Sequence, residues 1–186
     1  MNKSLKIKRM TGMSIFAVLL VVLQLFCIIP VSAGLELNLG LIVIIIGSVL
    51  YGPIFGLVLG SISGFLTFMS PATQAVFWPI SIGLTLVVCV LKTALAGLVC
   101  GLIYKCFKKY NRYVVIIIAS LFVPIVNTSV YSLGATLFFN GGGFFIVFGL
   151  VIANFLFELG ACAILSPVVY RLTNIATDNF DLGVNK

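Results

Sequence analysis

Apolar residues fill most of the chain in long runs, and short polar or Gly- and Pro-containing breaks separate these runs. Runs of this length are typical of transmembrane helices. We predict six membrane-spanning helices, at about residues 10–29, 37–50, 53–69, 82–107, 113–138 and 143–172. The second is short for a hydrocarbon core of about 30 Å, so we expect it to be tilted, kinked or incompletely spanning. Residues 70–81, which contain Pro71 and Pro79, are expected to form a structured loop.

The composition predicts a single all-α membrane domain over residues 1–186. The chain is 62% hydrophobic and 8% charged, whereas soluble domains are about 45–50% apolar and about 25% charged. Its basic start, apolar stretch and "VSAG" at 31–34 resemble a secretory signal peptide. However, the apolar stretch of about 20 residues exceeds the usual signal core of about 7–15, so we expect it to be retained as the first helix.

The net charge of +7 is concentrated at the ends of the predicted helices. Basic residues precede the first helix, fill the loop "KCFKKYNR" at 105–112 and close the chain. The three loops on the other side, at 30–38, 70–81 and 139–142, hold one charged residue, Glu36. Because basic residues accumulate in cytoplasmic loops, both termini are predicted to be cytoplasmic. The charges are therefore topology signals in a lipid bilayer, and nucleic-acid binding is not expected.

The sequence lacks the patterns of an enzyme or a cofactor-binding protein. It has no histidine, no GxxxxGK[ST] motif and no CxxC pair among its five cysteines. No nucleophile–base pair or metal-ligating cluster stands out, and no inverted repeat relates the two halves. We therefore expect no catalytic site, no metal and no cofactor in this chain, and a binding subunit that takes its energy from a partner.

Several polar residues are predicted to lie at one depth in the outer half of the bilayer. Lys92 lies 13 residues before Lys105, and Glu158 lies 13 before Arg171. At about 1.5 Å per residue, both lie roughly 20 Å from the cytoplasmic side. We expect one outward-open substrate pocket, lined by Gln24, Lys92, Asn127, Tyr131, Asn154 and Glu158, with Asn38 and Trp78 from the outer loops. The alternative is that Lys92 and Glu158 simply pair and that the amides hold helices together.

Small residues form a separate pattern in the third helix. Its glycines recur at a constant spacing of four, at Gly52, Gly56, Gly60 and Gly64. Because little hydrophobic force acts between helices in lipid, their association depends on close backbone approach. We expect this stripe to pack within the bundle; the alternative is a smooth surface that docks or slides on a partner. A second set of small residues lies within the fourth predicted helix, at Ala96, Gly97, Cys100 and Gly101.

Three segments carry a resemblance to a known family: "LNLGLIVIIIGSVLYGPIFGLVLGSISGFL" at 37–66, "LKTALAGLVCGLIYK" at 91–105 and "PIVNTSVYSLGATLFF" at 124–139. The first combines an apolar helix, a tight Gly-Pro turn and a glycine-rich helix, and the second is a Lys followed by small residues and a basic loop. Together with the length and the six predicted helices, these segments resemble the substrate-binding S component of energy-coupling factor (ECF) vitamin transporters.

The resemblance implies a six-helix protein of the bacterial cell membrane that captures a vitamin from outside with high affinity. It implies docking on a transmembrane coupling subunit driven by two cytosolic ATPases, which use ATP, and toppling in the membrane to release the vitamin inside. The family's pocket lies in the outer halves of the later helices, which matches the positions of Lys92, Asn127, Tyr131, Asn154 and Glu158. The Ala-xxx-Ala docking pattern of the family's first helix is absent, and the small residues available in "TGMSIFAVLL" are Gly12, Ser14 and Ala17.

The polar set favours a small anionic molecule with hydroxyl or amide groups, because Lys92 supplies a cation and the amides supply donors and acceptors. The Asn-Thr after a proline in the fifth helix resembles the pantothenate and folate branch of the family. Pantothenate is our expected ligand, with folate, pyridoxine and riboflavin as alternatives. Two other classes stay open: a stand-alone ion-coupled secondary carrier that uses Glu158, and a structural membrane protein without a ligand.

Overall fold

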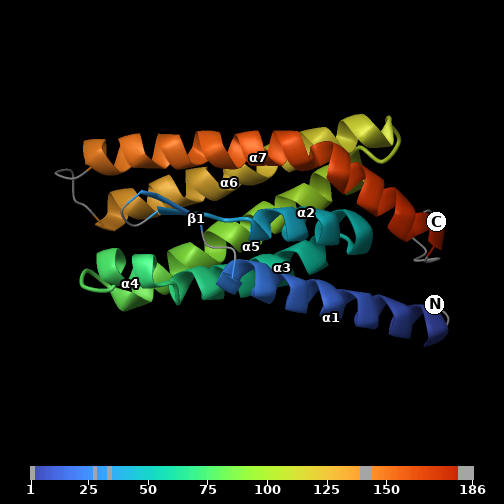
Figure 1. The fold of residues 1–186 in the computed structure, drawn as a ribbon, viewed down its shortest axis with the longest axis horizontal. Coiled ribbons are helices and arrows are strands. Elements are labelled where there is room, and N and C mark those ends of the chain that lie inside the picture. The colour runs from blue at the N-terminus through green and yellow to red at the C-terminus, as the bar shows by residue number, and fades with distance from the viewer. Residues whose placement is uncertain (1–2, 27–28, 33–34, 139–143, 180–186) are drawn as a thin grey trace.

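The computed structural model describes residues 3–26, 29–32, 35–138 and 144–179 (Figure 1). In these residues, seven helices and a two-stranded hairpin follow in the order α1 (Lys3–Phe26), β1 (Ile29–Ser32), β2 (Leu35–Leu37), α2 (Gly40–Tyr51), α3 (Pro53–Phe68), α4 (Pro71–Phe77), α5 (Ile82–Cys106), α6 (Arg112–Phe138) and α7 (Phe144–Asn179). Two stretches of the prediction lie outside the described residues: 27–28 in the first span and 139–142 in an outer loop.

The helices confirm a membrane bundle but not the full count of six spans. Four described helices, α1, α5, α6 and α7, are long and apolar enough to cross a membrane. The pair α3 and α4 meets the same test only as one span with a bend of 67°. The second helix is short, as predicted: the 12 residues of α2 correspond to a length of about 18 Å.

The predicted bounds differ from the structure mainly at the two ends of the chain. α1 already begins at Lys3 and ends at Phe26, and α7 continues to Asn179 instead of ending near residue 172. The all-α prediction also missed the hairpin, in which Ile29 pairs with Leu37 and Pro30 with Glu36 in antiparallel register. Residues 70–81 are structured, as expected, because they contain α4.

Local sequence signals explain where the middle helices begin. Gly52 has a φ of 99°, a conformation that favours glycine, and Pro53 follows it at the first turn of α3. Gly52 is therefore the turn residue between α2 and α3 and not a member of the packing stripe predicted for it. Ser70 caps α4 by accepting a hydrogen bond from the Thr73 backbone N–H at 3.3 Å.

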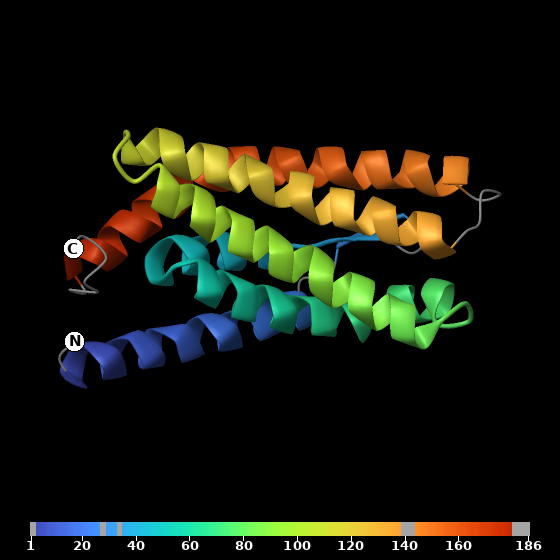
Figure 2. The ribbon, with the colours of Figure 1, turned by 180° about the vertical axis from the view of Figure 1, so that it is seen from behind.

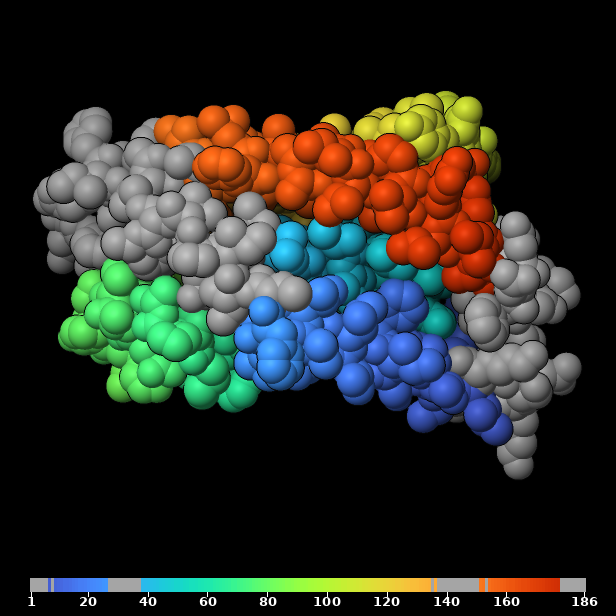
Figure 3. Space-filling model, in the orientation of Figure 1, coloured from blue at the N-terminus to red at the C-terminus, as the bar shows by residue number. Residues whose placement is uncertain are grey.

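The helices lie side by side along the long axis of the molecule. The beginning of α1, the end of α7 and the α5–α6 turn gather at one end, and α4 lies at the opposite end (Figures 1 and 2). The basic start of α1 and the basic α5–α6 turn therefore lie at the same end of the molecule as the end of α7 (Figures 1 and 2). This agrees with the prediction that both termini lie on the same side of the membrane. Figure 3 shows α1 and α7 on one face, with a strip of α2 between them.

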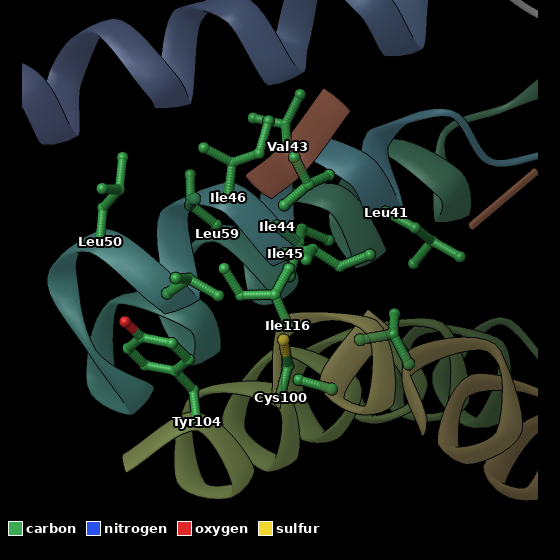
Figure 4. Close-up of a cluster of buried hydrophobic side chains, with 14 of the residues drawn as sticks. Leu41, Val43, Ile44, Ile45, Ile46, Leu50, Leu59, Cys100, Tyr104 and Ile116 are labelled. Atoms are coloured by element: carbon green, nitrogen blue, oxygen red, sulfur yellow. The ribbon is translucent and has the colours of Figure 1, made fainter. Parts of the chain in front are cut away.

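The core forms around α2, whose residues are buried along almost its whole length. Leu41, Ile44 and Ile45 are nearly inaccessible to solvent. They lie in one cluster with Cys100 of α5 and Ile116 of α6 (Figure 4). Because α2 contacts α1, α3, α5, α6 and α7, it is the central element that positions the other helices.

α3 and α5 approach each other backbone to backbone through the glycine stripe. A Cβ atom placed on Gly60 would lie 2.7 Å from Ala94 Cα, and one on Gly64 would lie 2.6 Å from Val90 Cα. Likewise, a Cβ on Gly56 would lie 2.8 Å from the Gly97 carbonyl carbon. Real Cβ atoms are essentially never this close to a backbone, so these positions leave no room for a side chain. The structure thus places Gly56, Gly60 and Gly64 inside the bundle and not on a surface that a partner can reach.

Candidate functional site

A buried carboxylate bound by two amides joins α6 and α7. Glu158 of α7 and Asn127 of α6 are each only 3% exposed. Asn127 Nδ2 donates to Glu158 Oε2 at 3.0 Å, and Asn154 Nδ2 donates to Glu158 Oε1 at 3.2 Å. Asn154 and Glu158 share a face because they are one helical turn apart. Three of the residues predicted from sequence therefore meet in one hydrogen-bonded group.

Each of these two amides keeps a carbonyl oxygen without a hydrogen-bond partner. Asn127 Oδ1 and Asn154 Oδ1 are both buried, and neither has a hydrogen-bond partner among the described residues. Buried polar groups are normally hydrogen-bonded, and leaving one unsatisfied costs about 1–3 kcal/mol. Unpaired acceptors on two neighbouring residues are therefore typical of a place where a ligand supplies the missing donors.

Lys92 of α5 lies beside this group without a direct bond to Glu158. Its Nζ is 4.9 Å from the centroid of the Tyr131 ring, a cation–π arrangement. No hydrogen bond or ion pair joins Lys92 to another residue in the described part of the chain, although its charge acts on the Glu158 carboxylate. The described structure therefore lacks the direct Lys92–Glu158 pair that the sequence left open as an alternative. The half-buried ammonium group is available to an anion.

Aromatic rings connect this group to α4 at the end of the bundle. The rings of Phe77 and Tyr131 meet edge to face with centroids 6.0 Å apart. The Trp78 ring packs on Phe68 at 5.3 Å, and Trp78 Nε1 is buried without a hydrogen-bond acceptor. α4 and the residue after it therefore bring one ring onto Tyr131 and one unpaired N–H donor near this end of the molecule.

Gln24 and Asn38, which we expected to line the same pocket, instead lie in a second polar cluster against α3. Gln24 Nε2 donates to the Ser63 carbonyl oxygen at 3.0 Å and to Thr67 Oγ1 at 2.8 Å. Ser63 Oγ donates to Gln24 Oε1 at 2.9 Å, and Asn38 Nδ2 lies 3.4 Å from Ser63 Oγ. The Gln24 amide is thus bonded at both its nitrogen and its oxygen. It ties the end of α1 to α3, and none of the hydrogen bonds among the described residues joins it to the group around Lys92.

The comparison with protein families decides what kind of membrane protein this is. The family model of the ECF transporter substrate-specific component matches residues 8–170. The chain belongs to this family. No curated protein matches the chain at a significant level.

As an ECF substrate-specific component, the chain is a subunit of a transporter and not an enzyme. Such a subunit binds a small molecule and works with the coupling subunit and ATPases of the ECF module. The described residues contain no group of three or more His, Cys, Asp or Glu side chains that could hold a metal ion.

The three small residues proposed for docking on α1 differ in where they lie. A Cβ placed on Gly12 would lie 2.9 Å from Tyr51 Cζ, so Gly12 packs on α2 inside the component. Ala17 packs against the core. Ser14 is exposed, and its hydroxyl donates to the Met10 carbonyl oxygen at 3.0 Å. Of the three residues, Ser14 is exposed, whereas Gly12 and Ala17 are partly buried.

Sequence reasoning missed several hydroxyl groups that hold the helices of this component together. Thr93 Oγ1 donates to the Gly60 carbonyl oxygen at 2.6 Å, and Ser48 Oγ donates to the Gly97 carbonyl oxygen at 3.1 Å. Both hydroxyls bridge helices at the positions where glycines bring the backbones together. The sequence held a signal for Thr93. Consecutive residues of a helix point to different faces, so Thr93 is expected on another face of α5 than its neighbour Lys92.

Proposed function

We propose that this component captures a small water-soluble vitamin from outside the cell with high affinity. It delivers the vitamin to the cytosol when it is docked on the coupling subunit, and the two partner ATPases hydrolyse ATP. The observation that carries this proposal is the group of Lys92, Asn127, Asn154 and Glu158, which combines an unpaired cation with two unpaired carbonyl oxygens. A binding site for a polar molecule needs a few convergent polar groups of this kind in apolar surroundings.

Pantothenate is the ligand we propose first. Its carboxylate suits Lys92, and its amide and hydroxyl groups suit the two asparagines. In the described part of the chain, the rings that we consider for stacking are Phe77 and Trp78, which already pack on Tyr131 and Phe68. This supports a ligand without a large flat ring over folate, pyridoxine or riboflavin.

Equilibrium binding to the purified chain tests this choice. Radiolabelled pantothenate is expected to bind in detergent or nanodiscs, and an excess of folate, pyridoxine or riboflavin is expected not to displace it. Displacement by one of these three, or no binding of pantothenate at all, would replace pantothenate by the competitor or by another vitamin.

Transport measurements separate this proposal from a stand-alone carrier. In proteoliposomes, uptake is expected only when the coupling subunit and both ATPases are present together with ATP. Uptake by the isolated chain under a proton gradient would instead favour an ion-coupled carrier that uses Glu158. The fact that both Glu158 oxygens are hydrogen-bonded to amides supports a fixed role for this carboxylate over a proton-relay role.

A further inference from the structure

The two oxygens of the Glu158 carboxylate are taken by two different asparagines. Asn127 reaches Oε2 from α6, and Asn154 reaches Oε1 from one turn earlier on α7. Glu158 is 3% exposed, so little of its side chain is left to touch a ligand. Glu158 therefore contacts the asparagines beside the proposed ligand and not the ligand itself.

A carboxylate at this place fixes the direction of both amides. An ionised carboxylate only accepts hydrogen bonds, whereas an amide donates through its nitrogen and accepts through its oxygen. Asn127 and Asn154 must therefore both turn Nδ2 toward Glu158 and Oδ1 away from it. The two Oδ1 atoms are the ones that are buried without a donor.

We infer that Glu158 is a positioning residue that sets the hydrogen-bond polarity of the ligand site. It holds the Asn127 and Asn154 carbonyl oxygens as two acceptors, and the ligand donates an N–H or O–H group to each. This inference rests on the proposed function and deepens it by naming the chemistry of the ligand.

Lys92 completes the description of the ligand. Its ammonium group has no carboxylate partner among the described side chains and lies over the Tyr131 ring at 4.9 Å. The Glu158 carboxylate, on which the Lys92 charge acts, is hydrogen-bonded to two amides. The ligand is therefore an organic acid that carries at least two N–H or O–H donors. Amines and acids without donors do not fit this arrangement.

The first experiment identifies the molecule that copurifies with the wild-type chain, by native mass spectrometry followed by fragmentation. The expected molecule has an acidic group and two or more donors. A bound vitamin that lacks the acid or has fewer than two donors would overturn the inference and leave vitamin capture standing. No copurifying molecule, together with no binding in a panel of vitamins, would overturn the proposed function itself and this inference with it.

The second experiment changes the polarity of the site through Glu158→Gln. The new side-chain amide donates on one side, so one asparagine has to turn its oxygen inward and its Nδ2 toward the ligand. The probes are pantothenate and a pantothenate derivative with both hydroxyls converted to methyl ethers, which accept but do not donate, so that the amide N–H is its single remaining donor. If mass spectrometry names another vitamin, that vitamin and its methylated derivative replace them.

Wild type is expected to prefer the parent probe over its methyl ether by about tenfold or more, because the ether leaves a buried carbonyl unpaired. Glu158→Gln is expected to shrink or reverse this preference. Glu158→Asp keeps an acceptor-only group and is the matched control, with weaker binding of both probes but the wild-type preference. A merely structural role would weaken both probes equally in Glu158→Gln, and this result would overturn the inference. Should Glu158→Gln fail to fold, equal affinity of wild type for the two probes would overturn it as well.

Discussion

At the scale of single residues, Lys92 and Gln24 show how two polar side chains at a similar predicted depth serve different purposes. Lys92 has a ring below it but no bonded carboxylate in the described structure. Gln24 has its amide bonded on both sides by Ser63 and Thr67. An intramembrane cation without a partner is a candidate for ligand binding, whereas a fully bonded amide holds helices together.

We expect Lys92→Met to lower the affinity for an anionic ligand by about 10- to 100-fold, since a hydrogen bond to a charged group contributes about 1.5–3 kcal/mol. The protein should remain folded, because methionine retains the length of the side chain in an apolar setting. Isothermal titration calorimetry on the purified variants measures the affinity, and gel filtration checks the fold. Lys109→Met, in the exposed basic loop, is the control and should bind like wild type. Equal affinities of the two variants would remove Lys92 from the site.

Gln24→Leu should have the opposite outcome. It removes the hydrogen bonds between α1 and α3 and is expected to lower the free energy of unfolding by about 0.6–1.7 kcal/mol, the range measured for interhelical hydrogen bonds in membranes. The affinity for the ligand is expected to stay the same. Thermal unfolding and calorimetry on one preparation test both statements. Lost affinity with unchanged stability would return Gln24 to the ligand site.

At the scale of helices, the contact of α3 with α5 is the tightest feature of the bundle. Glycines at three successive turns of α3 leave no α3 side chain between the two backbones at these positions. From α5, Thr93 Oγ1 donates a hydrogen bond of 2.6 Å to the Gly60 carbonyl oxygen. Dispersion contacts between closely approaching backbones compensate for the low helix propensity of these glycines. α3 and α5 therefore form one unit, which carries Lys92 on its far side.

Gly60→Ala should reveal this contact by adding a single methyl group. It is expected to lower the free energy of unfolding by about 1–3 kcal/mol, the usual cost of overpacking a tight core. Gly160→Ala is the matched control, since nothing lies within 4 Å of a Cβ at that position of α7. Unfolding of both variants, followed by heat or by SDS titration, gives the comparison. Equal stability of the two variants would mean that α3 and α5 are not in backbone contact.

At the scale of the whole molecule, the ends of the bundle differ in charge. The beginning of α1, the α5–α6 turn and the end of α7 lie at one end (Figures 1 and 2). The basic residues of "KCFKKYNR" are in that turn. From the positive-inside rule we expect this end to lie in the cytosol and α4 to lie outside.

Cysteine labelling tests this orientation. Two single-cysteine variants are needed. The first retains only the exposed Cys106, the last residue of α5. The second carries Ala75→Cys, on the exposed side of α4, as its single cysteine. A membrane-impermeant maleimide added to intact cells is expected to label the second variant and not the first, and cell lysis is expected to expose both. The reverse pattern in intact cells would invert the topology.

The docking of this component on the coupling subunit is also a property of the whole molecule. α1 is the least buried of the four long apolar helices, and Ser14 is exposed on it. Ser14→Trp is expected to lower ATP-dependent uptake through a steric clash while ligand binding to the isolated chain persists. Val87→Trp, at an exposed position of α5, is the control for a bulky ring in lipid. Full uptake by Ser14→Trp would move the docking face elsewhere.

Hydropathy predicted the main helices well, because bilayer thickness dictates long apolar runs. The same signal cannot give a helix its rotation about its axis. Gln24 was assigned to the substrate pocket from residue counting, yet its side chain faces Ser63 and Thr67 of α3. By contrast, Asn127, Asn154 and Glu158 meet as the sequence predicted, because two of them are one turn apart on a single helix.

The hairpin and the turn glycine show a second limit of the sequence. Residues 30–38 were predicted to form an outer loop, yet the pairing of Ile29 with Leu37 shows two short strands in this segment. Gly52 fits a spacing of four with the three packing glycines, yet its φ of 99° belongs to a turn. Periodicity alone does not separate a glycine needed for conformation from one needed for packing.

The position of α2 also bears on which membranes suit this protein. Its length of about 18 Å is far below a hydrocarbon thickness of about 30 Å. Hydrophobic mismatch, however, acts on surfaces that acyl chains touch, and α2 is enclosed by five other helices. The acyl-chain length that the protein tolerates is therefore set by the long helices around α2, and α2 itself imposes no thinning on the bilayer.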